Sequence, residues 1–301
     1  MREPDLYDCI VTPVRANEGV GVTSLAGAPP SQASLRPRHG QRPRALLAED
    51  NPVNVEVASA MLRGLGVEVA CAANGEEALA AVRAGDYDLV LMDCMMPVMD
   101  GMAATAEIRR LEQQRGRTRT TPIVAITANA LQGDRERCLA AGMDDYISKP
   151  FSQQALADTL GRWIALPRPT RAPDSPAVPA ASPAAAINPL ALDAIRALST
   201  DQGELLLHRV LATFLQDTPR QLAALHEAVA ENDPATIRKT AHSLKSSSAN
   251  VGADMLAKLF KDLEQMARAG QTGGAAGQIA QLEREFQSVR HSLSLILPKG
   301  A

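Results

Sequence analysis

Between residues 43 and 165 the sequence alternates five times between a short apolar run and a longer amphipathic stretch. The apolar runs read ALLAE, VEVACA, DLVLMD, PIVAITA and DYISK, and each precedes a stretch such as VNVEVASAMLRGL or GMAATAEIRRLEQQ. Strands that alternate with helices predict a parallel sheet, because the helices connect successive strands across its faces. We therefore predict an α/β domain over residues 43–165, with a five-stranded, doubly wound parallel sheet.

A proline-rich segment follows this region. Residues 165–189 read ALPRPTRAPDSPAVPAASPAAAINP, in which prolines recur every few residues. Because proline fixes φ and lacks an N–H donor, such a segment supports neither a helix nor a sheet ladder and is typical of an extended tether. We therefore predict a Pro/Ala-rich linker over residues 166–188.

Helical periodicity dominates the sequence beyond the linker. Stretches such as LLLHRVLATFLQ and LAKLFKDLEQMARA repeat apolar residues every three or four positions. This pattern predicts an all-α domain over residues 189–298, folded as an antiparallel helical bundle. At the other end of the chain, residues 1–42 are expected to be a disordered or remnant N-terminal segment.

Composition excludes several classes of protein. The net charge of -3 is too small to indicate nucleic acid as a direct partner, and no apolar run approaches the roughly 20 residues of a membrane span. The four cysteines lie far apart and form no C-x-x-C pair, which argues against a disulfide framework or a zinc site. We expect a cytoplasmic protein.

Polar residues follow the predicted strands of the first domain. Glu49 and Asp50 follow the first strand, Asp93 ends the third, and Thr127 and Lys149 end the fourth and fifth. The carboxyl ends of parallel strands meet at one edge, so three carboxylates should converge there and favour a divalent cation such as Mg²⁺. A carboxylate beside such an ion can attack phosphorus, while a hydroxyl and an ammonium hold the phosphoryl oxygens. Each residue alone is more often a helix cap or a surface group, but together they predict a phosphoryl-transfer site.

The stretch AHSLKSSSANVGA carries one histidine among small side chains. A helix over residues 234–251 would bury one stripe, formed by Ile237, Ala241, Leu244, Ser248 and Val251. His242 lies off this stripe and is expected to be exposed, with Lys239 and Lys245 beside it. Neighbouring cations should lower its pKa and leave a neutral, nucleophilic nitrogen near pH 7. The small Ser246 and Ala249 should leave room for another domain to approach.

The first domain resembles a bacterial response-regulator receiver domain, which has the flavodoxin-like fold. The resemblance covers about 120 residues and rests on LLAEDNPVN, LVLMDCMMPVMDG, PIVAITANA and DDYISKPF, in this order. It implies that Asp93 is phosphorylated and that Mg²⁺ is held by Glu49, Asp50, Asp93 and the backbone carbonyl of Met95. It also implies that Thr127 and Lys149 bind the phosphoryl group. Pro97 and Gly101 fit the loop after the acceptor strand, the glycine because it tolerates positive φ.

The second domain resembles a histidine phosphotransfer (HPt) domain, a four-helix bundle. The resemblance rests on AHSLKSSSANVGA and on the upstream stretch LLHRVLATFLQDTPRQLAALHEAVAENDPATIRKT. It implies that His242 carries a phosphoryl group and that Lys245 assists. Ser246 departs from the glycine of many members, although a serine is small enough to leave the histidine accessible.

A receiver followed by an HPt domain resembles the C-terminal part of hybrid sensor histidine kinases. The resemblance implies a two-component phosphorelay in which Asp93 accepts a phosphoryl group from a phosphohistidine, and His242 exchanges it with a receiver aspartate. The implied partners are a sensor histidine kinase and response-regulator receiver domains. No ATP-binding kinase domain is recognisable, so the chain is not expected to use ATP directly. The sequence leaves open whether Asp93 transfers its phosphoryl group to His242 of the same chain. It also leaves the oligomeric state open.

Three alternative interpretations remain. DLYDCIVTPVR resembles the end of another receiver, and the first alternative is that the chain is a fragment of a longer hybrid histidine kinase. The receiver could instead act as a phosphorylation-independent docking module. A haloacid-dehalogenase-type phosphatase would also form an aspartyl phosphate, but it requires a second aspartate at the position of Met95.

Overall fold

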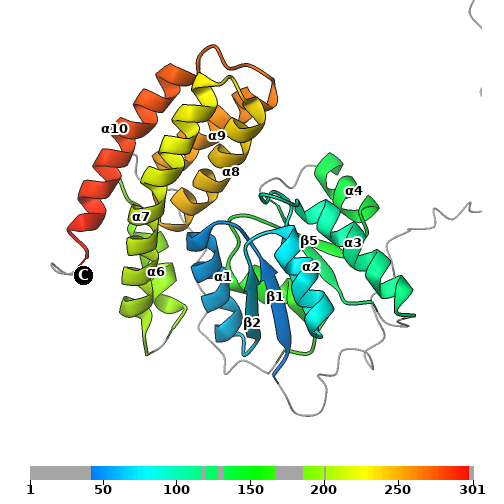
Figure 1. Ribbon diagram of the computed structural model, residues 1–301. Coiled ribbons are helices and arrows are strands. Elements are labelled where there is room, and N and C mark those ends of the chain that lie inside the picture. Colours follow the sequence, from blue (N-terminus) through cyan, green and yellow to red (C-terminus); the bar gives the residue numbers. More distant parts are fainter. Residues whose placement is uncertain (1–41, 117–119, 128–131, 167–185, 200, 298–301) are drawn as a thin grey trace, which may run out of the picture.

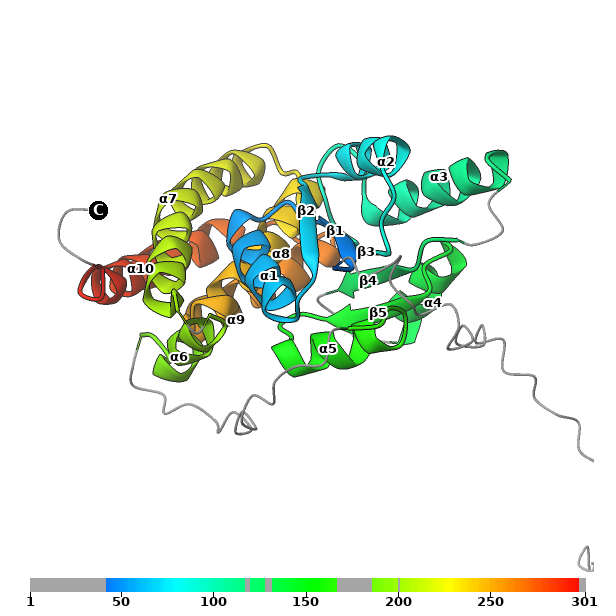
Figure 2. The same cartoon turned by 90° about the horizontal axis from the view of Figure 1, so that it is seen from below.

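Residues 42–116, 120–127, 132–166, 186–199 and 201–297 are described by the computed structural model of this chain. Five strands form one parallel sheet in the order β2-β1-β3-β4-β5 (Figures 1 and 2). The strands are β1 (Arg44–Ala48), β2 (Glu68–Ala72), β3 (Leu89–Asp93), β4 (Ile123–Thr127) and β5 (Asp145–Ser148). The predicted α/β fold is confirmed, while the predicted tail and most of the linker lie outside the described residues.

Five helices cover the two faces of this sheet. They are α1 (Pro52–Gly64), α2 (Gly75–Ala84), α3 (Gly101–Gln114), α4 (Gln132–Ala140) and α5 (Gln153–Gly161). Alternate side chains of each central strand point to opposite faces, so Leu47 and Leu91 pack with α1 and α5, whereas Leu46 and Val90 pack with α2 and α3. The central strands are thus buried on both sides, which accounts for their continuous apolar sequences.

The second domain consists of helices, as the periodicity predicts. They are α6 (Pro189–Ala197), α7 (Gly203–Ala230), α8 (Pro234–Asn250), α9 (Asp254–Arg268) and α10 (Ala275–Ser294), of which the last four form the bundle (Figure 1). Phe214, Phe260 and Phe286 are buried in its core, and the rings of Phe214 and Phe286 meet edge to face with centroids 6.1 Å apart. The side chain of Asp233 caps the start of α8 by accepting hydrogen bonds from two backbone N–H groups.

The bundle is docked on the α/β domain through α1. Seen from below, α1 lies between the sheet and the bundle (Figure 2), where it contacts α7 and α8. Buried apolar side chains of α1 and of the bundle form one continuous cluster. Part of the α8 surface outside the predicted core stripe is therefore covered by α1 of the other domain.

Polar contacts surround this apolar junction. Asn51 donates from its side-chain amide to Ser243 Oγ at 2.9 Å, and Arg209 forms an ion pair with Glu56 at 2.8 Å. Ser243 lies on α8 and Arg209 lies on α7, so these contacts hold both helices against α1, which starts beside the carboxyl ends of the strands. Within the described residues, no helix is both long and apolar enough to span a membrane.

Candidate functional site

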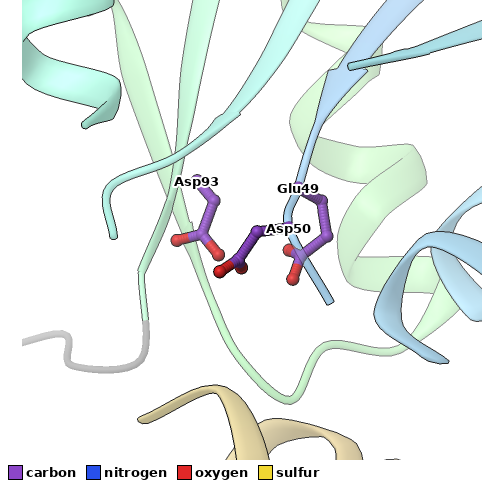
Figure 3. A group of neighbouring side chains, drawn as sticks. All are labelled: Glu49, Asp50 and Asp93. Atoms are coloured by element: carbon purple, nitrogen blue, oxygen red, sulfur yellow. The ribbon is translucent and has the colours of Figure 1, made fainter. Parts of the chain in front are cut away.

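Three acidic side chains converge at the carboxyl edge of the sheet. Glu49 and Asp50 follow β1, and Asp93 is the last residue of β3 (Figure 3). One carboxylate oxygen from each lies within 4.8 Å of the others. Glu49 and Asp93 are each 2% exposed, and Asp50 is half-buried. The structure therefore brings together the three side chains that the strand-end argument selected.

Lys149 forms ion pairs with two members of this acidic cluster. Its ammonium lies 2.5 Å from Glu49 Oε2 and 2.6 Å from Asp93 Oδ2. Burial alone would lower the pKa of Lys149, but the two carboxylates raise that pKa above its ordinary value, so the lysine stays charged.

The acidic groups respond differently to burial and to this ammonium. Burial raises the pKa of Glu49 despite the opposing effect of Lys149, and burial together with the charge of Asp93 raises the pKa of Asp50 to about 6. Burial would also raise the pKa of Asp93, but the charges of Lys149 and His242 bring it below its ordinary value. Three carboxyl groups thus lie together at this edge of the sheet, a set of oxygen ligands that fits a small divalent cation.

The loop after Asp93 is shaped by close backbone contacts. Met95 N–H donates to Asp93 Oδ1 at 3.1 Å, and Cys94 N–H donates to the Ile126 carbonyl at 3.1 Å. The proposed reason for Gly101 is wrong, because the residue with positive φ in this loop is Val98 at 64°. Gly101 is instead required by proximity, since a Cβ atom there would lie 2.0 Å from the backbone oxygen of Asp93.

Thr127 and Lys149 lie at adjacent strand ends beside the acidic cluster. Thr127 ends β4 and is buried, and its carbonyl accepts a 2.7 Å hydrogen bond from Lys149 N–H. The pairing places both residues at the same edge as Asp93. That their side chains serve one site with Asp93 stays a prediction from the strand order.

The predicted exposure of His242 is wrong, because the histidine is only 6% exposed. Its Nδ1 lies 2.7 Å from Glu264 Oε1 on α9, and the other oxygen of this carboxylate pairs with Lys245 at 2.5 Å. Two contacts join α8 to the α/β domain beside the histidine. Arg238 of α8 contacts the sulfur of Met95, and Ser243, the residue after the histidine, contacts Asn51. The predicted stripe of Ile237, Ala241, Leu244, Ser248 and Val251 is confirmed as buried.

Glu264 changes the electrostatic argument for His242. The charged neighbours predicted for His242 are cations of its own helix, whereas the charged group that touches the imidazole is a carboxylate from α9. Burial alone would raise the pKa of Glu264, but hydrogen bonds and charges from His242 and Lys245 hold that pKa at about 2. No local sequence signal identifies this contact, since 22 residues separate the two side chains.

The two domains enclose a cavity of about 590 Å³. The α/β domain lines it with Cys94, Met95 and Thr127, which flank Asp93 at the strand ends. The bundle lines it with His242 and Lys245, together with further basic residues of α8 and α9. His242 therefore lies beside the same space as residues that adjoin Asp93 in the chain.

Comparison with known families agrees with this architecture. Residues 45–161 match the response regulator receiver domain, and residues 209–292 match the Hpt domain. The chain therefore contains a receiver domain followed by an Hpt domain, the two domain types of a two-component phosphorelay.

Curated relatives include a sensor protein and a histidine-protein kinase. The chain is 33% identical to Sensor protein GacS of Pseudomonas syringae pv. syringae over 225 residues, which is 73% of this chain and 24% of that protein. It is 30% identical to Signal transduction histidine-protein kinase BarA of Shigella flexneri over 255 residues, or 84% of this chain and 27% of that protein. The chain thus spans about a quarter of the length of these relatives.

A solved structure is also similar to part of the chain. It is the receiver domain of sensor histidine kinase PA1611 from Pseudomonas aeruginosa PAO1, determined with a magnesium ion coordinated in the active site cleft. The sequence identity is 51% and the TM-score is 0.37, and the match covers 41% of this chain and 97% of that one.

The depressed pKa of Glu264 predicts a pH-dependent contribution to stability. We expect Glu264→Gln to destabilise the bundle by about 1–2 kcal/mol at pH 7, after allowance for partial solvent screening. Because the folded-state pKa is about 2 and the ordinary value is 4.5, this contribution should be complete above pH 4.5 and disappear as the pH falls toward 2. Urea unfolding at several pH values measures it.

A second histidine–glutamate pair provides the control for this measurement. His226 and Glu283 lie 2.8 Å apart on the surface of the bundle, and both side chains are about half exposed. Glu283→Gln should change the free energy of unfolding by less than about 0.5 kcal/mol at any of these pH values. Equal effects of the two substitutions would contradict the role assigned to the buried pair.

Proposed function

We propose that this chain transfers phosphoryl groups from Asp93 to His242 within one molecule. In this scheme Asp93 accepts the group from a phosphohistidine of a sensor histidine kinase, and His242 delivers it to the receiver domain of a separate regulator. The observation that carries the proposal is the shared cavity, which is lined by residues adjoining Asp93 and by His242 itself. We place the receiver domain at residues 43–165 and the HPt domain at residues 189–298.

The acidic cluster supports a magnesium requirement. Glu49, Asp50, Asp93 and the backbone carbonyl of Met95 would hold the ion. When bound, it would offset the negative charge of the carboxylates and of the phosphoryl oxygens. Lys149 would provide a second positive charge beside Asp93, because its ammonium already lies 2.6 Å from Oδ2.

The contacts of His242 define its part in the transfer. Nδ1 faces the Glu264 carboxylate, so this nitrogen carries the proton, and Nε2 keeps the lone pair that attacks phosphorus. A P–N bond forms at Nε2 while the P–O bond to Asp93 breaks, and the electron pair returns to the Asp93 carboxylate. Lys149 stabilises that carboxylate, and Glu264 stabilises the positive charge on the imidazole ring.

Transfer within one molecule predicts kinetics that do not depend on protein concentration. After a short exposure to radiolabelled acetyl phosphate and Mg²⁺, followed by removal of the donor, label should move from Asp93 to His242 with the same rate constant over a hundredfold dilution. Phosphohistidine survives alkali and aspartyl phosphate does not, so alkali treatment of quenched samples measures the distribution.

Substitution of the second acceptor provides the control. In His242→Ala the label should stay on Asp93, and no alkali-stable fraction should form. A rate that falls in proportion to dilution would indicate transfer between molecules, which contradicts the proposal. Failure of the wild-type chain to label at Asp93 would instead favour the docking-module interpretation.

A further inference from the structure

Asn54 connects the acidic cluster with the bundle. Its side chain is 5% exposed, and both of its polar ends are engaged. The amide nitrogen donates to Glu49 Oε1 at 2.7 Å, and the amide oxygen accepts from Asn250 Nδ2 on α8 at 2.8 Å. Two hydrogen bonds thus link a carboxylate of the receiver directly to a helix of the other domain.

The orientation of the Asn54 amide follows from its partners. Both oxygens of the Glu49 carboxyl group accept from other donors, Oε1 from Asn51 N–H and Oε2 from Lys149, so the NH₂ group of Asn54 faces Glu49 and its oxygen faces α8. Asn250 presents a donor to that oxygen and therefore favours the same orientation. If the bundle moves away, this preference is lost, and the Asn54 oxygen is left to solvent.

Asn54 makes the shorter of the two hydrogen bonds that Glu49 Oε1 accepts. Oε1 also accepts a longer hydrogen bond of 3.4 Å from the backbone of Asn51, whereas Oε2 contacts Lys149. The cavity among Glu49, Asn54, Lys149 and Asn250 is about 20 Å³, which leaves room for about one water molecule. The position of this carboxylate therefore depends strongly on the Asn54 side chain.

We propose that Asn54 is a positioning residue that couples docking of the HPt domain to cation binding at the acidic cluster. With the bundle docked, Asn250 holds Asn54, and Asn54 holds Glu49 in place for a divalent cation. By thermodynamic linkage, cation binding then strengthens docking by the same factor. The proposal rests on the magnesium site of the proposed function, and it adds that closing of the two domains and loading of the site favour each other.

The test is the Mg²⁺ affinity of the full chain, measured by isothermal titration calorimetry. Asn250→Ala does not touch the acidic cluster, yet it should weaken Mg²⁺ binding about fivefold, the loss expected for one hydrogen bond in the chain of contacts. Asn54→Ala should weaken binding at least as much. In the double variant, Asn250→Ala should add no further loss, because its effect passes through Asn54.

Arg209→Ala is the matched control. It removes another contact between α1 and the bundle, the Arg209–Glu56 ion pair, which does not reach Glu49. Because a partly exposed ion pair contributes little to docking, Mg²⁺ affinity should stay within about a factor of two of wild type. Small-angle scattering with and without Mg²⁺ provides a second readout: Mg²⁺ should increase the compact population in wild type and in Arg209→Ala, but less in Asn250→Ala.

Two results would overturn the inference: unchanged Mg²⁺ affinity in Asn250→Ala, or equal losses in Asn250→Ala and Arg209→Ala. These results are distinct from failure of the proposed function. If wild type bound no Mg²⁺, the magnesium site itself would be wrong, and the coupling would fall with it. If Mg²⁺ binding were coupled to docking but no label reached His242, the inference would stand while the transfer scheme failed.

Discussion

Asp93→Asn is expected to reduce labelling of His242 from acetyl phosphate by at least about a hundredfold, because a carboxamide is not a nucleophile toward phosphorus. The substitution preserves the shape of the side chain, so an oxygen can still accept from Lys149, whose ammonium lies 2.6 Å from Oδ2. The fold should therefore survive. Loss of label at His242 in a folded protein would show that the phosphoryl group enters through Asp93.

Asp100→Asn is the matched control for this experiment. Asp100 lies in the same loop, is exposed, and caps α3 by accepting from Ala103 N–H at 2.8 Å. Asparagine is an equally good cap, so this variant should label as wild type does. If Asp93→Asn still labelled His242 at the wild-type rate, the phosphoryl group would have another entry point and the relay order would be wrong.

Lys149→Met is expected to destabilise the metal-free receiver domain by about 3–5 kcal/mol, the cost of removing one partner from a buried ionic group. The ammonium contacts Glu49 and Asp93, and each of these residues is only 2% exposed. Methionine fills similar volume but leaves both carboxyl groups without this counter-charge. Saturating Mg²⁺ should recover part of the loss, because a cation at the acidic cluster supplies positive charge again.

Urea unfolding followed by tryptophan fluorescence measures this effect in the receiver alone. Trp163 is the single tryptophan of the chain, and its indole N–H donates to Asp145 at 2.9 Å, so it reports on the α/β domain. Lys261→Met, on the exposed side of α9, should leave this transition unchanged. A difference below about 1 kcal/mol between the two variants in chelator would contradict the role given to Lys149.

The sheet and the acidic cluster could be predicted because they depend on local patterns and on one topological rule. Buried parallel strands need continuous apolar residues, and amphipathic helices need apolar residues every three or four positions. Once the strands are located, their carboxyl ends must meet at one edge. The placement of Glu49, Asp50 and Asp93 within 4.8 Å follows without knowledge of any long-range contact.

The surroundings of His242 could not be predicted in the same way. Helical periodicity separates the core stripe of α8 from its other faces, and that division is confirmed. It says nothing of what approaches those faces from other elements. Glu264 comes from the next helix and the cover over His242 comes from the other domain, so the expectations of exposure and of purely cationic neighbours were wrong.

Gly101 shows that a correct residue can be chosen for a wrong reason. The sequence suggests conformational freedom, but its backbone lacks the positive φ that would require glycine. The requirement comes from the Asp93 carbonyl, which occupies the space of a Cβ atom. Only the packed structure places that oxygen there.

The sequence by itself determined the α/β class of one domain and the all-α class of the other, the order of their elements, and the residues at the strand ends and on the histidine helix, because these depend on short-range periodicity. The tertiary structure alone decided that α8 docks on α1, that Glu264 holds His242, and that Asn54 joins Glu49 to Asn250. Those contacts join residues far apart in the chain. They form because apolar surfaces of distant segments are buried against each other, and no local sequence pattern specifies which surfaces pair.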